Sequence, residues 1–315
     1  MISFIVIGKN EGWRLEKCFK GIYSFIKEES IVDYEVIYVD SRSTDSSVEL
    51  SKSFNNTKTI LITGDCNAAI ARNIGAKEAS GDILFFIDGD MELIPGFYLD
   101  VVKDGKMVYP FVSGIEKDIL HDNNWNYVET QVRRKYTEGI DQYEPTTGGL
   151  FMIEAQLWER VGGMDTRFRR SQDLDLGYRL TKMGYKLCRK PQIWVNHYTR
   201  FMQVRRESMG YVKYNTLLLR NYFFYPVAQR RFLVDFSSFW MLLFSFLLMI
   251  VMHSWYPILL YFAIICFRVF RTIFKHDIKY GFFMGLIWQI KFDFLVINSF
   301  LFFWPKTKNL QYEVK

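Results

Sequence analysis

Apolar, β-rich runs alternate with helix-like stretches through the first ninety residues, and this alternation constrains the fold more than any other feature of the chain. Strands that alternate with helices in this way form parallel β/α units. The run at 83–87 is apolar at every position, as expected for a central strand that is covered on both faces. We therefore predict an α/β domain with a mostly parallel sheet flanked by helices. The expected strands are 2–7, 35–39, 59–62 and 83–87, and the expected helices are 13–25, 46–54 and 67–79.

The pattern is less regular between residues 106 and 199. Residues 121–144 are polar, aromatic and charged without a clean period, and we predict a helix plus a loop there. Leu176, Leu180 and Met183 recur at helical spacing, and Gly184 follows them as a stop signal. The other elements that we expect are strands at 106–115, 149–153 and 192–195 and helices at 154–161 and 175–183.

The C-terminal third differs from the rest of the chain in charge and hydropathy. Residues 1–199 carry 25 Lys and Arg against 29 Asp and Glu, whereas residues 200–315 carry 15 against 5. Basic and aromatic residues interleave at 200–231, and an uncharged apolar run then covers 236–252 and resumes after His253. One membrane span takes about 20 apolar residues, so the joined run fits a tight hairpin, a re-entrant pair or a tilted span.

A last apolar segment, at 280–304, is interrupted by Lys291 and Asp293. It fits a third membrane segment with a paired charge, or a helix that lies in the membrane interface. We therefore expect the chain to divide into four parts. These are a catalytic domain at 1–199, a basic aromatic juxtamembrane segment at 200–231, hydrophobic membrane-associated helices at 232–304 and a polar tail at 305–315.

The cysteines and the N-terminus indicate the compartment of the first part. The four cysteines form no Cys-x-x-Cys pair, so a zinc or redox motif is not indicated and a reducing compartment fits. The apolar start at 2–7 is too short for a signal peptide and has no basic residues before it. We expect the first part on the cytosolic side of the cytoplasmic membrane.

Acidic and polar side chains follow the predicted strands, at the edge of the sheet where α/β proteins bind ligands. They are Asn10-Glu11, Asp40 and Asp88-Gly89-Asp90. Two carboxylates one residue apart after a buried strand suit Mg²⁺ or Mn²⁺, which prefer oxygen ligands and commonly bridge carboxylates to phosphates. The alternative is a solvated acidic turn, because Asp and Gly both favour turns.

Further segments accompany these residues in a fixed order. They are 67–76 and 80–82 before the Asp88-Gly89-Asp90 motif, and 147–152, 161–165 and 172–180 after it. In this order and spacing the chain resembles the family 2 glycosyltransferases, whose fold is the GT-A nucleotide-diphospho-sugar transferase fold. The resemblance covers residues 2 to about 197.

The resemblance implies a site for a nucleotide-sugar donor at the strand ends. Asn10 and Glu11 correspond to an Asn-Glu pair beside the nucleotide. Asp40 corresponds to the aspartate that accepts a hydrogen bond from the base, and Arg72 to the arginine near the base and diphosphate. Asp88 belongs to the same nucleotide-sugar site.

The resemblance also implies a cation, Mn²⁺ or Mg²⁺. Asp88 and Asp90 correspond to the Asp-x-Asp pair, whose second aspartate usually holds the metal. The cation would offset charge on the departing nucleoside diphosphate. His197 follows the last predicted strand, and the resemblance places it near the metal or diphosphate, whereas a structural histidine is the alternative.

On the acceptor side, the resemblance assigns the catalytic base to Asp173. This carboxylate would take the proton of the acceptor hydroxyl group as that group attacks the anomeric carbon. The alternative for Asp173 is a helix N-terminal acid that the helix dipole stabilises. Gly148, Gly149 and Gln172 are the other residues expected on the acceptor side.

Several positions depart from the family pattern. Ile7 replaces a proline, Lys9 replaces an aromatic residue, and 40–43 reads Asp-Ser-Arg-Ser in place of Asp-Asp-Gly-Ser. These three departures leave the identity of the donor's nucleotide base open. Gln172 replaces the glutamate before the base and affects acceptor positioning. Residues 203–206 lack the tryptophan that follows Gln-x-x-Arg in processive synthases, which argues against a polymer-extruding enzyme.

We therefore predict an inverting, metal-dependent sugar transfer from a nucleotide-diphospho-sugar, with a uridine diphosphate sugar favoured, to a hydroxyl or phosphate group. A lipid-linked or glycan acceptor at the cytoplasmic membrane face is expected. The alternative is an inactive member that binds a nucleotide-sugar or scaffolds a membrane assembly, and Gln172 supports it. Nucleic-acid binding by 200–231 fits the charges, but the adjoining apolar run makes a membrane the simpler partner. The sugar, the linkage, the number of spans and the oligomeric state stay open.

Overall fold

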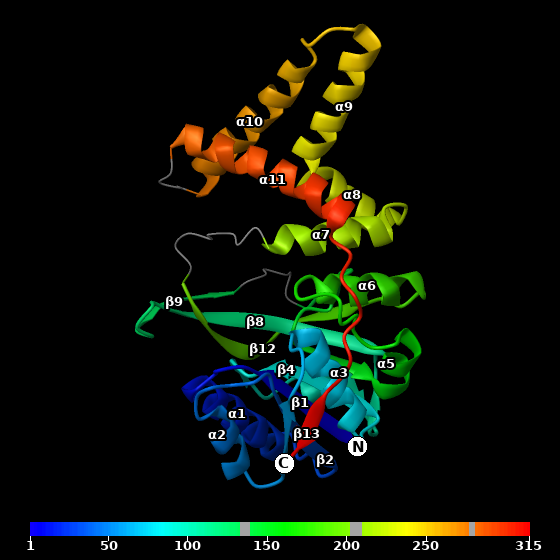
Figure 1. Cartoon of the computed structure of the whole chain (residues 1–315). Coiled ribbons are helices and arrows are strands. Elements are labelled where there is room, and N and C mark those ends of the chain that lie inside the picture. The colour runs from blue at the N-terminus through cyan, green and yellow to red at the C-terminus, as the bar shows by residue number, and fades with distance from the viewer. Residues whose placement is uncertain (133–138, 202–209, 277–280) are drawn as a thin grey trace. The chain divides into compact units, whose positions relative to one another are not determined.

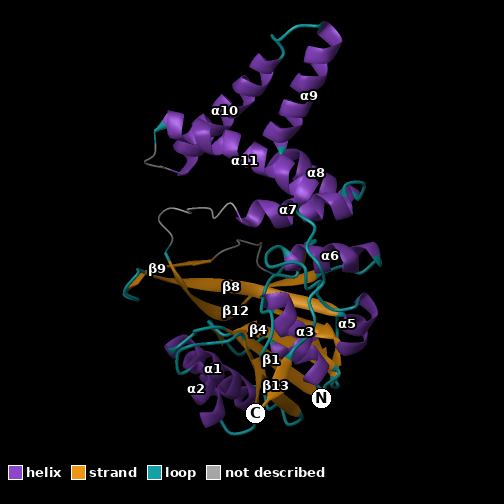
Figure 2. Ribbon diagram, viewed as in Figure 1, coloured by secondary structure: helices purple, strands orange, loops and turns teal. Residues whose placement is uncertain are grey.

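The computed structural model describes residues 1–132, 139–201, 210–276 and 281–315. The chain divides into two compact units, of which the first contains residues 1–201 together with 306–315. This first unit is an α/β domain built on one large mixed sheet, and the second consists of helices (Figures 1 and 2). The motif at 203–206 lies outside the described residues.

Four parallel strands form the centre of the sheet, in the order β3-β2-β1-β4. Each is followed by a helix or a short turn, so the chain makes the β/α units that the sequence predicts. The strands are β1 Ile2–Gly8, β2 Tyr34–Asp40, β3 Thr57–Ile62 and β4 Ile83–Asp88, and the helices between them are α1 Trp13–Glu28, α2 Ser47–Ser53 and α3 Ala68–Glu78.

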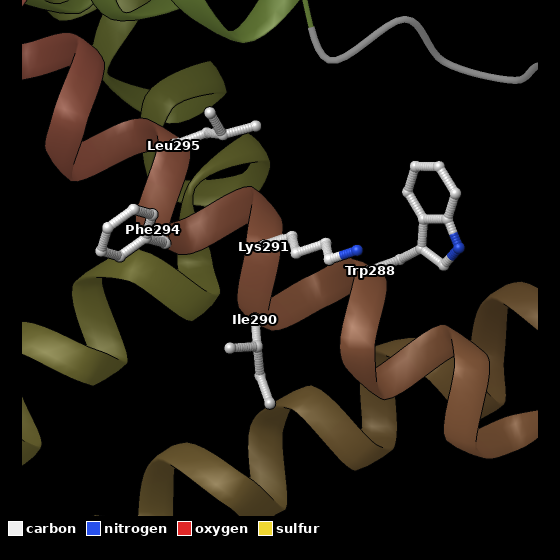
Figure 3. A pocket seen from close by; sticks show the side chains of 5 residues that line it. All are labelled: Trp288, Ile290, Lys291, Phe294 and Leu295. Atoms are coloured by element: carbon white, nitrogen blue, oxygen red, sulfur yellow. The ribbon is translucent and has the colours of Figure 1, made fainter.

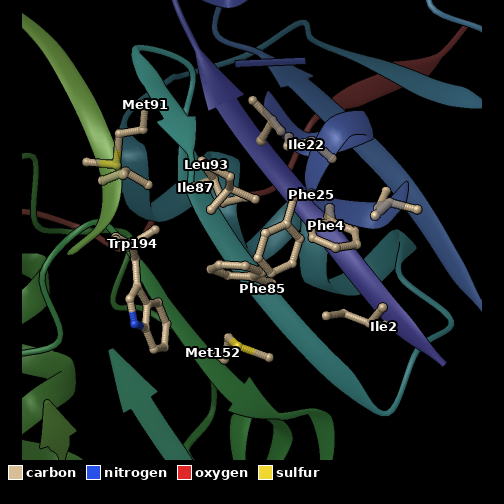
Figure 4. Close-up of a cluster of buried hydrophobic side chains, with 14 of the residues drawn as sticks. Ile2, Phe4, Ile22, Phe25, Phe85, Ile87, Met91, Leu93, Met152 and Trp194 are labelled. Carbon is tan, nitrogen blue, oxygen red and sulfur yellow. The ribbon is translucent and has the colours of Figure 1, made fainter. Parts of the chain in front are cut away.

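Helices cover both faces of the central strands, because alternate side chains of a strand point to opposite faces. On one face, Phe4 and Phe85 pack with Phe25 of α1 in a cluster of buried apolar side chains (Figure 4). On the other face, Ile5 and Phe86 pack with α3, α5 (Ala155–Val161) and α6 (Gln172–Lys182). The prediction that β4 is buried on both faces is confirmed.

The remaining strands extend the sheet beyond β4. β11 (Phe151–Glu154) pairs antiparallel with β4, and β8 (Phe111–His121) pairs antiparallel with β11. β12 (Cys188–Arg200) runs parallel to β8 and also pairs with two short strands, β5 (Met91–Leu93) and β10 (Gln142–Tyr143). This arrangement is the mixed, mostly parallel sheet with flanking helices expected of the GT-A fold.

Two predicted elements are wrong in part. Where a helix plus loop was expected, the described residues form β9 (Tyr127–Val132), which pairs with β8. Every residue of β9 is exposed, so no apolar alternation marks it as a strand and only its partner strand defines it. The strand expected from residue 106 begins instead at Phe111. Before it, α4 (Tyr98–Val101) leads into a small hairpin of β6 (Val102–Lys103) and β7 (Lys106–Met107).

The last residues of the chain return to the first unit. β13 (Tyr312–Val314) pairs antiparallel with β3 at the edge of the sheet. Just before it, the Lys308 ammonium group lies 2.8 Å from the Asp65 carboxylate, and the Thr166 hydroxyl group donates to the Lys308 carbonyl at 3.1 Å. The sequence did not predict this strand, because three residues are too few to show a period.

The second unit contains five described helices. α9 and α10 are separated by a turn that begins at His253, so the long apolar run is two helices. Among the described residues, one helix, α11, is long and apolar enough to cross a membrane, and α8 with α9 passes the same test but is bent by 80°. The helices are α7 Gly210–Tyr222, α8 Pro226–Asp235, α9 Ser237–Met252, α10 Ile258–His276 and α11 Phe282–Phe302.

The two charged residues of α11 have different surroundings. Asp293 is buried and accepts hydrogen bonds from Ser238 Oγ of α9 at 2.6 Å and from the Tyr261 hydroxyl group of α10 at 3.0 Å. Lys291 is exposed and faces away, because residues two apart lie on different sides of a helix. Lys291 lines a groove with Trp288, Ile290, Phe294 and Leu295, all residues of α11, and Figure 3 shows these side chains pointing away from the helix in several directions.

The packing of Trp194 yields a stability prediction. The Trp194 ring is fully buried and stacks on Phe97, with the ring centroids 4.0 Å apart, and a methyl group at Gly114 would collide with it. We expect Gly114→Ala to cost about 2 kcal/mol by overpacking and to lower Tm of the full chain in detergent by roughly 5 °C. Gly281→Ala, where the added methyl group meets open space, is the matched control and should leave Tm unchanged. Equal Tm values for the two variants would contradict the prediction.

Candidate active site

The carboxyl ends of β1, β2 and β4 lie side by side in the sheet. Gly8 pairs with Asp40, and Ile7 pairs with Asp88. Because these strands are parallel, the polar residues that follow them emerge at one edge. The structure therefore brings Asn10, Glu11, Asp40, Asp88 and Asp90 to this edge.

The loop after β1 is fixed to the loop after β2. Asn10 has a φ of 56°, and its side-chain oxygen accepts a hydrogen bond from the Thr44 amide at 2.7 Å. Asp40 is buried and accepts hydrogen bonds from the Tyr38 hydroxyl group at 3.0 Å and from the Ser43 amide at 2.8 Å. Both carboxylate oxygens keep a free lone pair after these bonds are made. That Asp40 accepts a hydrogen bond from the base of the nucleotide stays a prediction.

Arg72 and Asp88 form a close ion pair. Arg72 is buried on α3, and its Nη2 lies 2.5 Å from Asp88 Oδ1. The Asp88 side chain keeps 33% of its surface exposed. Partial burial raises the pKa of Asp88 to about 6, although Arg72 acts in the opposite direction. Arg72 is thus the ion-pair partner of Asp88, whereas the charged partners of Asp90 are other residues.

Asp90 lies beside a histidine that is held by a second carboxylate. His197 Nε2 is 3.4 Å from Asp90 Oδ2, and His197 Nδ1 is 2.7 Å from Asp118 Oδ1. Burial disfavours a charged ring, but the hydrogen bonds with Asp118 and Asp90 raise the pKa of His197 to about 10. Burial also acts to raise the pKa of Asp90, but His197 and Arg14 lower it below its usual value. Pairing of β12 with β8 and β5 brings these residues together.

The structure places a group of side chains that could hold a cation next to Asp90. Glu116, Asp118 and His197 offer ligand atoms that lie within 4.8 Å of one another. A histidine that ligates a metal usually donates its other ring N–H to a carboxylate, which is the relation of His197 to Asp118. Carboxylate oxygens suit Mg²⁺ and Mn²⁺, and imidazole nitrogen is a further ligand for divalent metals.

Arg14 links the first loop to Asp90. Its Nη2 lies 2.6 Å from Glu11 Oε2, and its Nη1 lies 3.5 Å from Asp90 Oδ2. Burial, together with the charge of Asp90, raises the pKa of Glu11 to about 7, although Arg14 lowers it. Arg14 also stacks over the Trp125 ring, with its guanidinium carbon 4.6 Å from the ring centroid.

Asp173 lines a cavity of about 150 Å³ next to these groups. Gly148, Gly149 and Glu116 also line it, and a methyl group at Gly149 would collide with the Asp88 carboxylate. Gly149 thus lines the cavity together with Asp173 and also lies against Asp88. Gln172 begins α6 but is not part of the cavity wall, and its Oε1 accepts no hydrogen bond from the residues that the structure describes.

Sequence reasoning missed several residues of this site. Glu116 and Asp118 lie two apart on β8 and face His197 only because β8 pairs with β12. Arg189 lines the cavity from β12, and Thr146 donates to Asp173. The contact between Arg14 and Glu11 could have been predicted from the sequence, because side chains three residues apart at the start of a helix lie close together.

Comparison with known proteins gives a consistent result. Residues 3–151 match the family described as glycosyl transferase family 2. The amylovoran biosynthesis glycosyltransferase AmsB of Erwinia amylovora is 28% identical over 204 residues, which cover 59% of this chain and 68% of that protein. Glycosyltransferase AglE of Haloferax volcanii is 32% identical over 203 residues, which cover 59% of this chain and 63% of that protein.

A third relative aligns along nearly the whole chain. It is the dolichyl N-acetyl-alpha-D-glucosaminyl phosphate 3-beta-D-2,3-diacetamido-2,3-dideoxy-beta-D-glucuronosyltransferase of Methanococcus voltae. It is 24% identical over an alignment of 322 positions, and this alignment covers 91% of this chain and 97% of that protein. The matched part of AglE is 63% of that protein, which is less than two thirds of its length.

Proposed function

The chain contains a glycosyltransferase family 2 domain, and on that premise we propose that it transfers a sugar from a nucleotide-diphospho-sugar to an acceptor, with inversion at the anomeric carbon. The observation that carries the proposal is the position of Asp173. Its carboxylate lines a cavity whose wall, at Gly149, touches the Asp88 carboxylate. A base on one side and a phosphate-binding edge on the other are what a direct displacement requires.

In the proposed reaction, Asp173 takes the proton of an acceptor hydroxyl group. The acceptor oxygen forms a bond to the anomeric carbon, and the bond from that carbon to the phosphate oxygen breaks. The electron pair of the broken bond leaves with the nucleoside diphosphate. Arg72 and Arg14 stand beside the strand ends, where their guanidinium groups favour the negative charge that develops there.

We propose that Asp90 and His197 hold the divalent cation, with Asp118 orienting the histidine. Bound there, Mn²⁺ or Mg²⁺ would supply charge neutralisation for the departing diphosphate. Asp88 is then a nucleotide-sugar residue whose carboxylate is fixed by Arg72 at 2.5 Å. Of the strand-end acids Asp40, Asp88 and Asp90, it is Asp90 whose carboxylate lies 3.4 Å from the His197 imidazole, so the donor set supports this division of roles.

We propose a lipid-linked acceptor at the cytoplasmic membrane face. The candidate span α11 and the apolar helices α9 and α10 support a place at the bilayer, and exposed Arg230 and Arg231 on α8 suit anionic headgroups. The name of the Methanococcus voltae relative describes a transfer to a dolichyl-linked sugar phosphate, and that relative aligns through the helical unit as well. A glycan acceptor is the other outcome that the experiment distinguishes.

The experiment is sugar transfer by membranes that contain the full chain. Radiolabelled nucleotide-sugars are supplied with Mn²⁺ or Mg²⁺, together with a polyprenyl phosphate, a polyprenyl-diphosphate sugar or a soluble glycan. We expect label in the lipid extract, and label only in the soluble glycan would refute the lipid-linked acceptor. Nucleotide binding by calorimetry without transfer to any acceptor would favour the inactive, scaffolding alternative.

A further inference from the structure

A short loop, residues 145–149, lies between α6 and the strands β8 and β12. We propose that Thr146 in this loop is a positioning residue, whose hydroxyl group fixes the Asp173 carboxylate so that Oδ1 is left to accept a proton. The inference rests on the proposed function, because it assigns Thr146 a role relative to Asp173 as the base.

The loop holds Asp173 through its side chain and its backbone. Thr146 Oγ1 donates to Asp173 Oδ2 at 3.0 Å. The amide and the hydroxyl group of Thr147 both donate to the Asp173 carbonyl, each at 3.3 Å. Asp173 Oδ1 has no hydrogen-bond partner among the described residues, and the side chain lines the cavity. One carboxylate oxygen is thus engaged, the other has no partner among the described residues, and Asp173 belongs to the wall of the cavity.

The loop cannot move away from α6 without loss of close packing. A methyl group at Gly177 of α6 would collide with the Pro145 carbonyl oxygen, so helix and loop touch backbone to backbone. This contact lies one helical turn beyond Asp173, on the same helix. Thr146 and Asp173 are therefore held at a fixed separation by the backbone as well as by their own hydrogen bond.

Arg189 fixes the loop from the side of the sheet. It is buried, and its Nη2 donates to the Thr146 carbonyl at 3.4 Å. Its Nη1 donates to Ser113 Oγ at 2.8 Å and to the Gly114 carbonyl at 3.1 Å, both on β8. Arg189 therefore joins Thr146 to the strand that also carries Glu116 and Asp118. Movement of the base relative to the cation-binding side chains would break this connection.

A fixed carboxylate matters because a general base acts only from a narrow range of positions. Proton transfer needs a heavy-atom distance of about 2.6–3.2 Å, and a displacement of about 1 Å can cost about 100-fold in rate. A hydrogen bond to a charged group is also stronger than one between neutral groups. Removal of the Thr146 hydroxyl group should therefore lower kcat and leave donor binding intact.

The test compares three variants of the full chain in membranes. We expect Thr146→Val to lower kcat by about 10- to 100-fold with the donor KM within about threefold of wild type. Thr146→Ser keeps the hydroxyl group and should restore most of kcat. Thr181→Val is the matched control, because the Thr181 hydroxyl group donates to carbonyl groups of its own helix, and it should keep kcat and KM.

Two further results separate the possible failures. In an Asp173→Asn background, Thr146→Val should have no additional effect on the residual rate, because both changes act on one proton transfer. If Asp173→Asn lowers kcat by about 1000-fold while Thr146→Val keeps wild-type kcat, the positioning role is refuted and the proposed function stands. Equal losses in Thr146→Val and Thr146→Ser would also refute it. Full activity of Asp173→Asn would refute the proposed function itself.

Discussion

Asp173→Asn should lower kcat by about 1000-fold and leave the affinity for nucleotide and cation unchanged. A general base contributes about 100- to 10,000-fold, and an amide oxygen cannot take the proton that a carboxylate takes. The substituted side chain has nearly the same shape and can still accept the hydrogen bond from Thr146. The loss is therefore expected in turnover and not in folding.

The measurement is sugar transfer by the full chain at saturating donor, with nucleotide binding followed by calorimetry on the same preparation. Asp104→Asn is the matched control, since Asp104 is exposed in a turn with a φ of 51°, a conformation that Asn also tolerates. We expect its kcat to equal that of wild type. An Asp173→Asn protein that turns over at the wild-type rate would remove Asp173 from the mechanism.

Removal of the Asp90 carboxylate is expected to have a comparable effect by a different route. Asp90→Ala should lower kcat/KM by about 1000-fold, because a bound cation contributes several kcal/mol and each ~1.4 kcal/mol is a factor of ten. Chelation by EDTA should abolish transfer by wild type, and Mn²⁺ or Mg²⁺ should restore it. Added metal should not restore the Asp90→Ala protein.

Asp118→Asn tests the same centre from one step away. Asp118 bonds His197 Nδ1 at 2.7 Å, and loss of such a partner typically costs about 10- to 100-fold in metal affinity. We therefore expect a higher metal concentration for half-maximal activity, with kcat largely recovered at saturation. Glu159→Ala, on the exposed surface of α5, should behave as wild type. Full activity of wild type in EDTA would exclude a required cation.

Much of the first unit follows from local patterns. β1 to β4 and α1 to α3 lie where the alternation of apolar runs predicts them, with their bounds shifted by a few residues. Because those strands are parallel, the acids after them had to share an edge, and Asp40, Asp88 and Asp90 do. The prediction failed at β9, where every residue is exposed and no period exists to be detected.

The order of strands, helices and strand-end acids was determined by the sequence alone, because each is encoded in neighbouring residues with a period of two or of 3.6. Tertiary structure decided which of the site's side chains contact one another. Asp118 lies 79 residues before His197, Thr146 lies 27 before Asp173, and Arg72 lies 16 before Asp88. Likewise β13 joins β3 from the far end of the chain. Such pairings arise from strand register and helix docking, which no local period encodes.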